Sequence, residues 1–436
     1  MTDILSLFPI TAGVNGEGHL TIGGCDTVEL AAQFDTPLYV FDEISLRHQC
    51  AEFKTEFARH YPGTSVVYAA KAFINRALAL IINEEGMGLD VVSTGELSIA
   101  RSIGFPMERA YFHGNNKSAE EIGLALKWGV GRIVVDNFHE MGMLNEIAQE
   151  RGSRPDILLR LSPGIDPHTH HYIATGIIDS KFGFPLAMGE KAVAEAISLP
   201  NLNLVGLHFH IGSLIFEVEP YEAAAEVTLN FAAQMQQKYS FELKELNIGG
   251  GFAIQYTLDS PAPPLAQYAE RIAARINDEC RRLKLKLPHL TIEPGRAIVG
   301  RAGVALYRVG ATKEIPGVRC YVSVDGGMAD NIRPALYGSR YEAVIANKLK
   351  GREKDKVVTI AGRFCESGDV LVKDIALPPV AAGDLIAIAD CGAYCLAMAS
   401  NYNGSLRPAI VLVKEGQARP IRRRETFSDL TRCDLI

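Results

Sequence analysis

Hydrophobic and polar positions change between two periods along the first two thirds of the chain. Short apolar runs rich in Val, Ile, Leu and aromatic residues alternate with longer segments that have helical spacing. The predicted strands cover residues 65–71, 88–92, 109–112, 132–135, 156–161, 203–209, 244–248 and 290–293. The predicted helices between them cover residues 75–84, 95–103, 118–128, 138–150, 189–198, 219–238 and 264–284. Eight strands, each but the last followed by a helix, over about 230 residues indicate a (β/α)8 barrel of the TIM type rather than an open doubly wound sheet.

The pattern becomes β-rich after Glu293. Short apolar runs separated by Gly and Pro predict an all-β module, and they cover residues 303–307, 319–324, 356–361 and 384–389. We therefore expect an N-terminal segment (1–42) whose strand near 37–42 joins this module, a barrel (43–293) and a C-terminal β-rich domain (294–436). The fold class is thus α/β, a barrel followed by an all-β domain. The irregular stretch 162–187 is expected to lie over the mouth of the barrel.

Length, charge and cysteine use limit the class of protein. A chain of 436 residues is too long for one ordinary core. With 44 basic and 51 acidic residues the net charge is -7, which disfavours nucleic acid and anionic membrane as partners. Residues 1–10 have no basic leader region, and no stretch approaches the roughly 18 apolar residues of a membrane span, so we expect a cytoplasmic protein. The eight cysteines form no Cys-x-x-Cys pair, which favours reduced thiols.

Lys71 ends the first predicted strand of the barrel, and barrel enzymes place their chemistry at this end of the strands. In an apolar site an ammonium loses solvation and its pKa falls. The neutral amine can then form a Schiff base with a carbonyl cofactor such as pyridoxal phosphate. Taken alone, this stretch is also compatible with a lysine that begins a loop and reaches water.

Polar residues follow later strands at the same end. His208 and His210 alternate onto one face of the sixth strand, and the glycine run 249–251 after the seventh frees backbone amides to bind a phosphate. Glu293 ends the eighth strand. Simpler interpretations are a tight turn, a core histidine or a metal ligand. Together, a lysine, an imidazole, a glycine loop and a carboxylate match the needs of pyridoxal phosphate. The histidines in the irregular stretch are interpreted as solvated; they are His168, His170 and His171.

These motifs carry a family resemblance. The chain resembles the fold-type III decarboxylases that use pyridoxal phosphate, and among them the diaminopimelate decarboxylases. The matching stretches follow one another along nearly the whole chain at residues 68–71, 90–96, 175–183, 208–213, 249–251, 293–296, 333–337, 365–369, 392–394 and 398–403. Leu214 departs from the glutamine that the family usually has there, which concerns local loop contacts.

The resemblance implies the cofactor site. Lys71 is expected to form the Schiff base, His210 to stack on the pyridine ring and Glu293 to face the pyridine nitrogen. The phosphate and the rest of the pyridoxal 5'-phosphate are expected to be bound by Ser213, Gly250, Gly251, Gly295, Arg296 and Tyr394. A carboxylate at the pyridine nitrogen favours the protonated ring, an electron sink for the carbanion left when carbon dioxide departs. This feature favours decarboxylation over racemisation.

The resemblance also implies a proton donor and a substrate. Cys365 matches the family's thiol donor, which reaches in from the neighbouring subunit, so a homodimer with shared sites is expected. The residues expected to bind the distal amino acid group of meso-diaminopimelate are Arg296, Arg333, Tyr337, Glu366 and Tyr394. A site built to pair a carboxylate rejects analogues without one by about 10^4 to 10^5, which favours diaminopimelate, with L-lysine as product, over lysine or ornithine.

Three alternatives stay open from the sequence. The first is a decarboxylase of the same fold that acts on carboxynorspermidine, ornithine or arginine. The second is a non-catalytic homologue that binds and regulates a decarboxylase; such a protein should have lost Lys71 or Cys365, and the chain has both. The third is a metal-dependent barrel hydrolase, which predicts bound zinc.

Overall fold

The computed structural model describes residues 2–166, 180–350 and 356–436. The chain divides into two compact units. One contains residues 1–49, 254–261 and 296–436, and the other contains residues 50–253 and 262–295. The domain boundaries after residues 42 and 293 that the sequence indicates stay a prediction. The three histidines of the irregular stretch, and its central part, lie outside the described residues.

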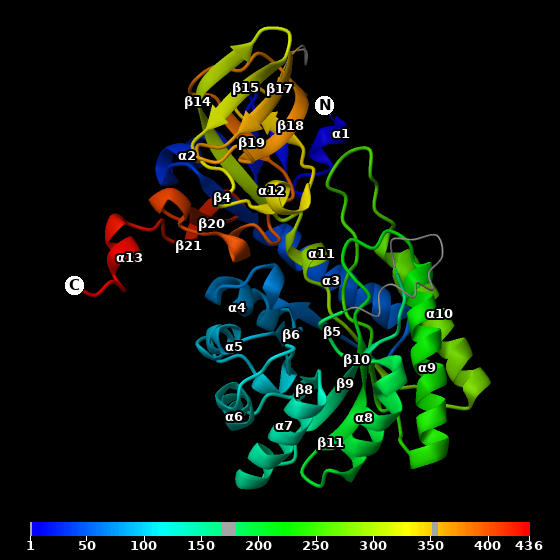
Figure 1. The fold of residues 1–436 in the computed structure, drawn as a ribbon. Helices are drawn as coiled ribbons and strands as arrows, with labels where there is room; N and C mark the ends of the chain where they lie inside the picture. Colours follow the sequence, from blue (N-terminus) through cyan, green and yellow to red (C-terminus); the bar gives the residue numbers. More distant parts are fainter. Residues whose placement is uncertain (1, 167–179, 351–355) are drawn as a thin grey trace. The chain divides into compact units, whose positions relative to one another are not determined.

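The second unit contains a closed barrel of eight parallel strands (Figure 1). The strands follow one another round the barrel as β5 (Thr64–Ala69), β6 (Gly88–Val91), β7 (Ala110–Phe112), β8 (Arg132–Val135), β9 (Asp156–Ser162), β11 (Asn203–Phe209), β12 (Glu245–Asn247) and β13 (His289–Ile292). β13 pairs with β5 and closes the ring, and the two-residue strand β10 (Phe184–Pro185) adds to β9. The predicted barrel is therefore confirmed.

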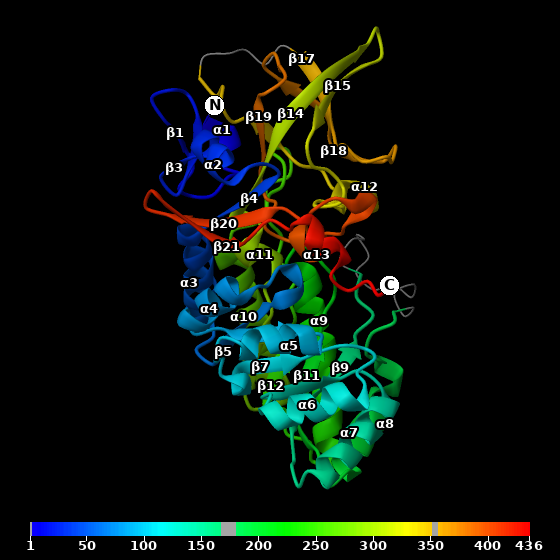
Figure 2. The same cartoon turned by 90° about the vertical axis from the view of Figure 1, so that its left-hand side faces the viewer.

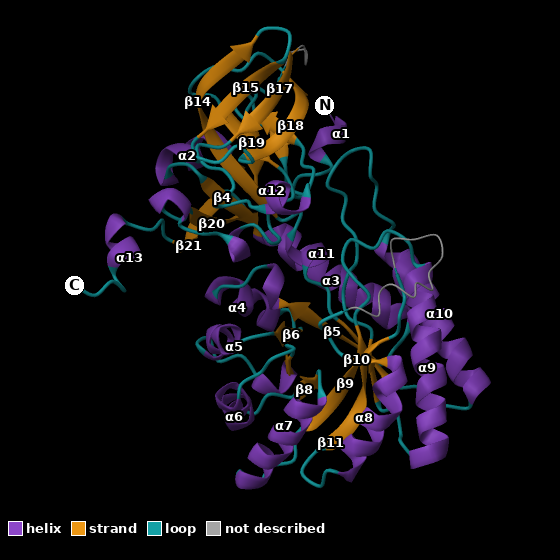
Figure 3. Cartoon of the chain, viewed as in Figure 1, coloured by secondary structure: helices purple, strands orange, loops and turns teal. Residues whose placement is uncertain are grey.

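Helices cover the outside of this ring, as Figure 3 shows. They are α4 (Arg76–Glu84), α5 (Thr94–Arg101), α6 (Ala119–Trp128), α7 (Phe138–Glu150), α8 (Leu186–Ser198), α9 (Glu219–Tyr239) and α10 (Leu265–Leu283). Several begin at a short polar residue in the connection after a strand, and its side chain accepts a hydrogen bond from the first turn. These N-caps are Asn75, Ser93, Ser118 and Asn137. These caps lie at the end of the barrel where the strands finish.

The first unit is built on a sheet (Figure 2). Its main path is β18 (Val370–Leu377), β17 (Lys356–Ala361), β15 (Arg319–Val324), β14 (Gly303–Ile315), β4 (Leu38–Asp42), β20 (Ala409–Lys414) and β21 (Gln417–Arg422), with β16 (Ala343–Ile345) and β19 (Leu385–Ile388) attached through β14. β4 pairs antiparallel with β14 and parallel with β20. The N-terminal strand near 37–42 therefore belongs to this sheet.

The N-terminal entry before β4 is built of short helices and strands. It forms α1 (Thr2–Leu5), the short strands β1 (Gly13–Val14), β2 (Leu20–Ile22) and β3 (Cys25–Asp26), and α2 (Thr27–Phe34). Asp26 caps α2 by accepting from the backbone amide of Val28. Apolar side chains of this entry pack into one buried cluster with those of β4, β14 and β20. Among the described helices, none is both long and apolar enough to cross a membrane.

Candidate functional site

Lys71 lies just beyond the end of β5. The strand ends at Ala69, and Lys71 occupies the single 3-10 turn η1 (Ala70–Ala72). Its side chain is 43% exposed, and its Nζ lies 3.6 Å from Oδ2 of Asp90, which belongs to β6. The apolar surroundings expected from the sequence are therefore wrong, because a carboxylate faces the amine and water reaches it. The position at the carboxyl ends of the barrel strands is as expected.

Glu293 follows β13 and is buried at this end of the barrel, with 4% of its side chain exposed. Its Oε1 lies 2.8 Å from Nε2 of His113 and accepts from Nδ2 of Asn247 at 2.6 Å, while its Oε2 lies 3.2 Å from Nε2 of His208. Burial alone would raise the pKa of Glu293, but the two imidazoles and their hydrogen bonds hold it well below its usual value. The site therefore contains a fixed carboxylate.

The two histidines after the sixth strand differ in their surroundings. His208 is buried, and burial lowers its pKa to about 4. His210 is partly exposed, and its Nδ1 accepts from the backbone amide of Gly250 at 3.2 Å. Burial of the ring also lowers the pKa of His210 well below its ordinary value, with the nearby charge of Lys71 acting in the same direction. Both rings are thus neutral near pH 7.

The glycine loop after β12 is tightly enclosed by backbone. A Cβ on Gly250 would lie 2.1 Å from the carbonyl oxygen of Glu293, so only glycine fits there. Gly251 has φ +106° and a Cβ there would lie 2.6 Å from the carbonyl oxygen of Gly212. The side chain of Asn247 accepts from the amide of Gly249 at 2.9 Å and orders the start of the loop. Such a cradle of close-packed glycine backbone suits a phosphate.

Ser213 and Gly295 are the other residues expected at the phosphate. Ser213 is exposed. A Cβ on Gly295 would lie 3.0 Å from Cβ of Ala69 at the end of β5, so the space between these two segments is also narrow. Both residues belong to the barrel unit, at the ends of its strands.

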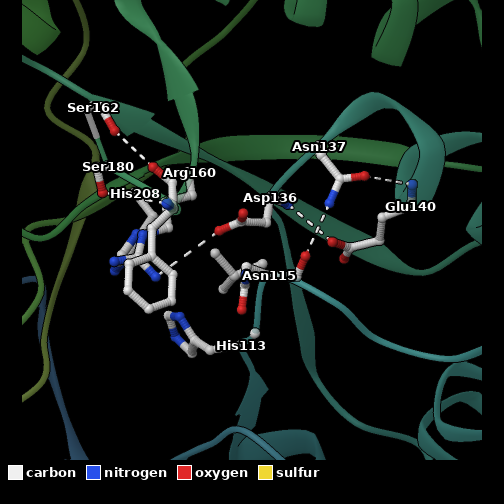
Figure 4. Close-up of polar contacts among 12 residues, drawn as sticks. His113, Asn115, Asp136, Asn137, Glu140, Arg160, Ser162, Ser180 and His208 are labelled. Carbon is white, nitrogen blue, oxygen red and sulfur yellow. Dashed lines mark hydrogen bonds and ion pairs between the residues drawn. The ribbon is translucent and has the colours of Figure 1, made fainter. Parts of the chain in front are cut away.

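A network of polar side chains continues round the barrel (Figure 4). The rings of His113 and His208 meet edge to face, with centroids 4.9 Å apart. The guanidinium of Arg160, on β9, points toward Asp136 at the end of β8 at 4.0 Å. Burial lowers the pKa of Arg160, and Asp136 acts against this shift. Sequence patterns gave no role to this arginine.

The residues expected to bind carboxylate form a cluster of arginines and tyrosines within the sheet unit. Nη1 of Arg296 donates to the hydroxyl of Tyr256 at 2.7 Å, and its guanidinium lies 4.7 Å from the ring centroid of Tyr394. The guanidinium of Arg333 lies 5.5 Å from the Tyr256 ring and 5.8 Å from the Tyr394 ring. Two buried guanidiniums thus share the faces of the same two aromatic rings.

Arg333 begins α12 (Arg333–Tyr337) and is 4% exposed. Its Nε donates to the hydroxyl of Tyr341 at 2.8 Å and its Nη2 to Oγ of Ser339 at 3.1 Å. Within residues 2–166, 180–350 and 356–436, no carboxylate forms an ion pair with this guanidinium. Tyr337 is 63% exposed, and its ring lies 5.9 Å from the same guanidinium. A buried cation held only by neutral groups can receive an anion.

Cys365 lies on a loop of the sheet unit and is exposed. Its backbone amide donates to Oδ1 of Asn403 at 2.9 Å. The buried carboxylate of Asp369 accepts from the amides of Phe364 at 2.8 Å and Met328 at 2.7 Å and so holds the loop. Glu366 is exposed beside the thiol in sequence.

The comparisons with known proteins agree with this chemistry. The family model "Pyridoxal-dependent decarboxylase, pyridoxal binding domain" matches residues 43–300. The diaminopimelate decarboxylase of Bacillus subtilis is 48% identical over 98% of this chain and 97% of its own. The crystal structure of diaminopimelate decarboxylase from M. jannaschii in complex with L-lysine superposes with a TM-score of 0.92, at 35% identity and with 98% of each chain covered. The chain belongs to the diaminopimelate decarboxylase family. A lysine/ornithine decarboxylase from Vibrio vulnificus complexed with putrescine is less similar, with a TM-score of 0.76 and 25% identity over 89% of this chain and 98% of its own.

Membership of the diaminopimelate decarboxylase family decides between cofactor and metal at Glu293. His113, His208 and Glu293 could in principle hold a divalent ion, since their ligand atoms lie within 4.8 Å of one another. However, the matching model is that of a pyridoxal-binding domain, and the glycine cradle beside the cluster suits a phosphate. The residues present therefore fit pyridoxal phosphate, the cofactor of this family.

Sequence patterns gave no role to four residues that contact Glu293 or the two arginines. His113 and Asn247 contact Glu293, and Tyr256 and Tyr341 contact the arginines. His113 and Asn247 had a usable signal, since each is a polar residue at the end of an apolar strand. The two tyrosines had none, because a tyrosine in a loop is ordinary.

Proposed function

We propose that the protein decarboxylates meso-2,6-diaminopimelate to L-lysine and carbon dioxide with pyridoxal 5'-phosphate as cofactor, the last step of lysine biosynthesis. The surroundings of Arg333 support this substrate, because Arg333 is a buried cation whose described side-chain partners are all neutral. Meso-diaminopimelate has a second carboxylate to meet it, whereas lysine and ornithine do not. The relatives named diaminopimelate decarboxylase support the same substrate.

The residues that match the family's cofactor motifs would hold the cofactor. Lys71 would bind its aldehyde and His210 its ring face, and the remaining contacts would come from Ser213, Gly250, Gly251, Gly295, Arg296 and Tyr394. When bound, pyridoxal phosphate supplies a ring that accepts the electron pair released with carbon dioxide. Glu293 would keep the pyridine nitrogen protonated, because a fixed carboxylate stabilises the adjacent positive charge.

Cys365 would deliver the proton that replaces carbon dioxide at the α-carbon. Its exposure fits a role at the site of a second subunit, and we propose a homodimer in which Cys365 of the partner subunit completes each site. Glu366, next to this thiol and also exposed, would pair with the distal ammonium of the substrate. Lysine biosynthesis further leads us to propose a cytoplasmic location.

The distal carboxylate would be bound by Arg333 and Arg296, with Tyr337 at the exposed side of α12. Forked guanidiniums pair carboxylates through two parallel hydrogen bonds. A substrate that lacks this group leaves the buried charge without a partner, and the expected discrimination is about 10^4 or more. This argument disfavours ornithine and arginine as substrates.

The test supplies meso-diaminopimelate, L-lysine, L-ornithine and L-arginine in parallel to purified protein with added pyridoxal phosphate, and measures carbon dioxide and amine release. We expect turnover of diaminopimelate alone. Arg333→Ala should lower kcat/KM for diaminopimelate by at least a hundredfold, whereas Arg340→Ala, which removes an exposed arginine paired with Asp259, should not. Turnover of another amino acid would overturn the substrate, and absence of turnover on all four would favour the regulatory alternative.

A further inference from the structure

A buried layer of hydrogen-bond donors surrounds Glu293 on the side of the barrel interior. His113 is 4%, His208 1% and Asn247 0% exposed. The three side chains come from the ends of β7, β11 and β12, whereas Glu293 follows β13. They therefore reach the carboxylate from three different strands and occupy both of its oxygens.

The protons in this layer can be assigned from its chemistry. An ionised carboxylate only accepts hydrogen bonds, so the Nε2 atom of each histidine that contacts Glu293 carries the hydrogen. In the part of the chain that the structure describes, Nδ1 of His208 is buried and has no hydrogen-bond partner. A second proton on this ring would leave an N–H without an acceptor in the core. His208 is thus a neutral donor, and it orients Glu293 without neutralising its charge.

Asn247 connects this layer to the phosphate loop. Its Nδ2 donates to Oε1 of Glu293 at 2.6 Å, and its Oδ1 accepts from the amide of Gly249 at 2.9 Å. One amide side chain therefore uses its donor on the carboxylate and its acceptor on the glycine loop. The planar amide of Asn247 thus links the position of the Glu293 carboxylate to that of the glycine loop.

The surroundings of His208 disfavour a positive charge on its ring. Burial and the neighbouring His113 and Arg160 lower its pKa, against the opposite effect of Glu293. Asp90 lies 3.7 Å from Nε2 of His113, so this nitrogen faces two carboxylates. A cationic partner for Glu293 would form an ion pair and compete with a positive pyridine nitrogen for the same carboxylate. Neutral donors leave the full negative charge available.

We propose that His113 and His208 are positioning residues that, with Asn247, fix the Glu293 carboxylate in one orientation and keep it anionic toward the pyridine nitrogen of the cofactor. The inference rests on the role proposed above for Glu293. Neither histidine is expected to touch the cofactor or the substrate. Loss of either should therefore change the protonation of the cofactor and the chemical step, while binding of the substrate stays the same.

The experiment uses the full-length enzyme loaded with pyridoxal phosphate that carries 15N in its ring, and it measures the 15N chemical shift of the pyridine nitrogen by NMR. We compare His113→Leu and His208→Leu, which remove the donor, with His208→Gln, which keeps an N–H donor. His139→Leu, an exposed histidine on α7, is the matched control. Both leucine variants should move the signal toward the unprotonated ring and lower kcat about tenfold or more, with KM unchanged. His208→Gln should recover most of both effects, and His139→Leu should resemble the wild type.

Glu293→Gln separates this inference from the proposed function. If Glu293→Gln leaves the 15N signal unchanged, the role of Glu293 itself is wrong. If Glu293→Gln moves the signal but neither leucine variant does, the positioning inference is overturned. Should the leucine variants not fold, 15N spectra of histidine-labelled wild-type enzyme at pH 6 decide, because the inference requires the neutral Nε2–H form of His208. An imidazolium at this position overturns it.

Discussion

Tyr256 is the residue that joins the two arginines expected to bind carboxylate. It accepts a hydrogen bond from Arg296 at 2.7 Å, and its ring lies 5.6 Å from the guanidinium of Arg296 and 5.5 Å from that of Arg333. Tyr256→Phe removes only the hydroxyl and keeps the ring. We expect this variant to impair binding of the substrate carboxylate while the chemical step continues.

The magnitude follows from the contacts. A buried hydrogen bond with a charged donor contributes about 1.5–3 kcal/mol, and each 1.4 kcal/mol is tenfold in affinity. Because the ring stays, the two stacking contacts, at about 0.5–2 kcal/mol each, are retained. KM for meso-diaminopimelate should therefore rise by roughly 10- to 100-fold, with kcat within about threefold of wild type. Burial raises the pKa of Tyr256 to about 12, so the effect should be constant from pH 6 to 9.

Steady-state kinetics of lysine release measure this split between KM and kcat. The matched control is Tyr61→Phe, which also removes a buried tyrosine hydroxyl, one that donates to the backbone carbonyl of Pro288 at 2.7 Å in the barrel unit. Tyr61→Phe should lose comparable thermal stability without a change in KM. If Tyr256→Phe lowers kcat at constant KM, or if the two variants behave alike, Tyr256 does not orient the arginines.

Three further predictions concern stability, pH and proton transfer. Lys117→Met should lower the free energy of unfolding by about 3–5 kcal/mol in urea denaturation, because the buried carboxylate of Glu140, 2.7 Å from the lysine, loses its cation. The double variant with Glu140→Gln should recover most of this loss. No recovery would contradict the pairing. The pKa of His208 is about 4 in the folded protein, so the unfolded chain binds a proton first as pH falls below about 6.5. The free energy of unfolding of wild type should therefore fall by roughly 1.4 kcal/mol per pH unit down to pH 4, relative to that of His208→Gln. A difference between the two melting curves that does not change with pH would refute this. Cys365→Ala should retain the cofactor's visible absorption but slow lysine release by roughly a hundredfold or more, while Cys433→Ala, another exposed thiol, should leave it unchanged; equal effects would exclude a specific proton donor.

The fold could be predicted well because its signals are local. The barrel strands are short apolar runs, and several of the helices that follow them begin at a capping residue, as at Asn75 and Ser118. Such signals act over a few residues and survive in any packing. The α2 helix before Leu38 is too short to give a long periodic pattern, and it packs against the sheet.

Sequence patterns name candidate site residues but not the contacts among them. His113, His208 and Glu293 stand on three strands that are not neighbours in the barrel order, so their contact depends on closure and register. A strand pattern places each residue at the correct end but does not tell which side chains meet across the interior. The surroundings of Lys71 were misjudged because the carboxylate that faces it, Asp90, comes from another strand, β6.

The residues around Glu293 and those around Arg333 surround charges of opposite sign, and each set fits the charge of the group that it would bind. Around Glu293 every contacting donor can be neutral, so the carboxylate keeps its charge for a cation. Around Arg333 the described partners are hydroxyls and aromatic rings, so the guanidinium keeps its charge for an anion. In both cases a direct counter-ion from the chain would have stabilised the fold locally but would have competed with the ligand. Neutral partners solve this conflict, because they hold a buried charge in place and leave it available, and they explain why histidine, asparagine and tyrosine, rather than opposite charges, surround the two groups.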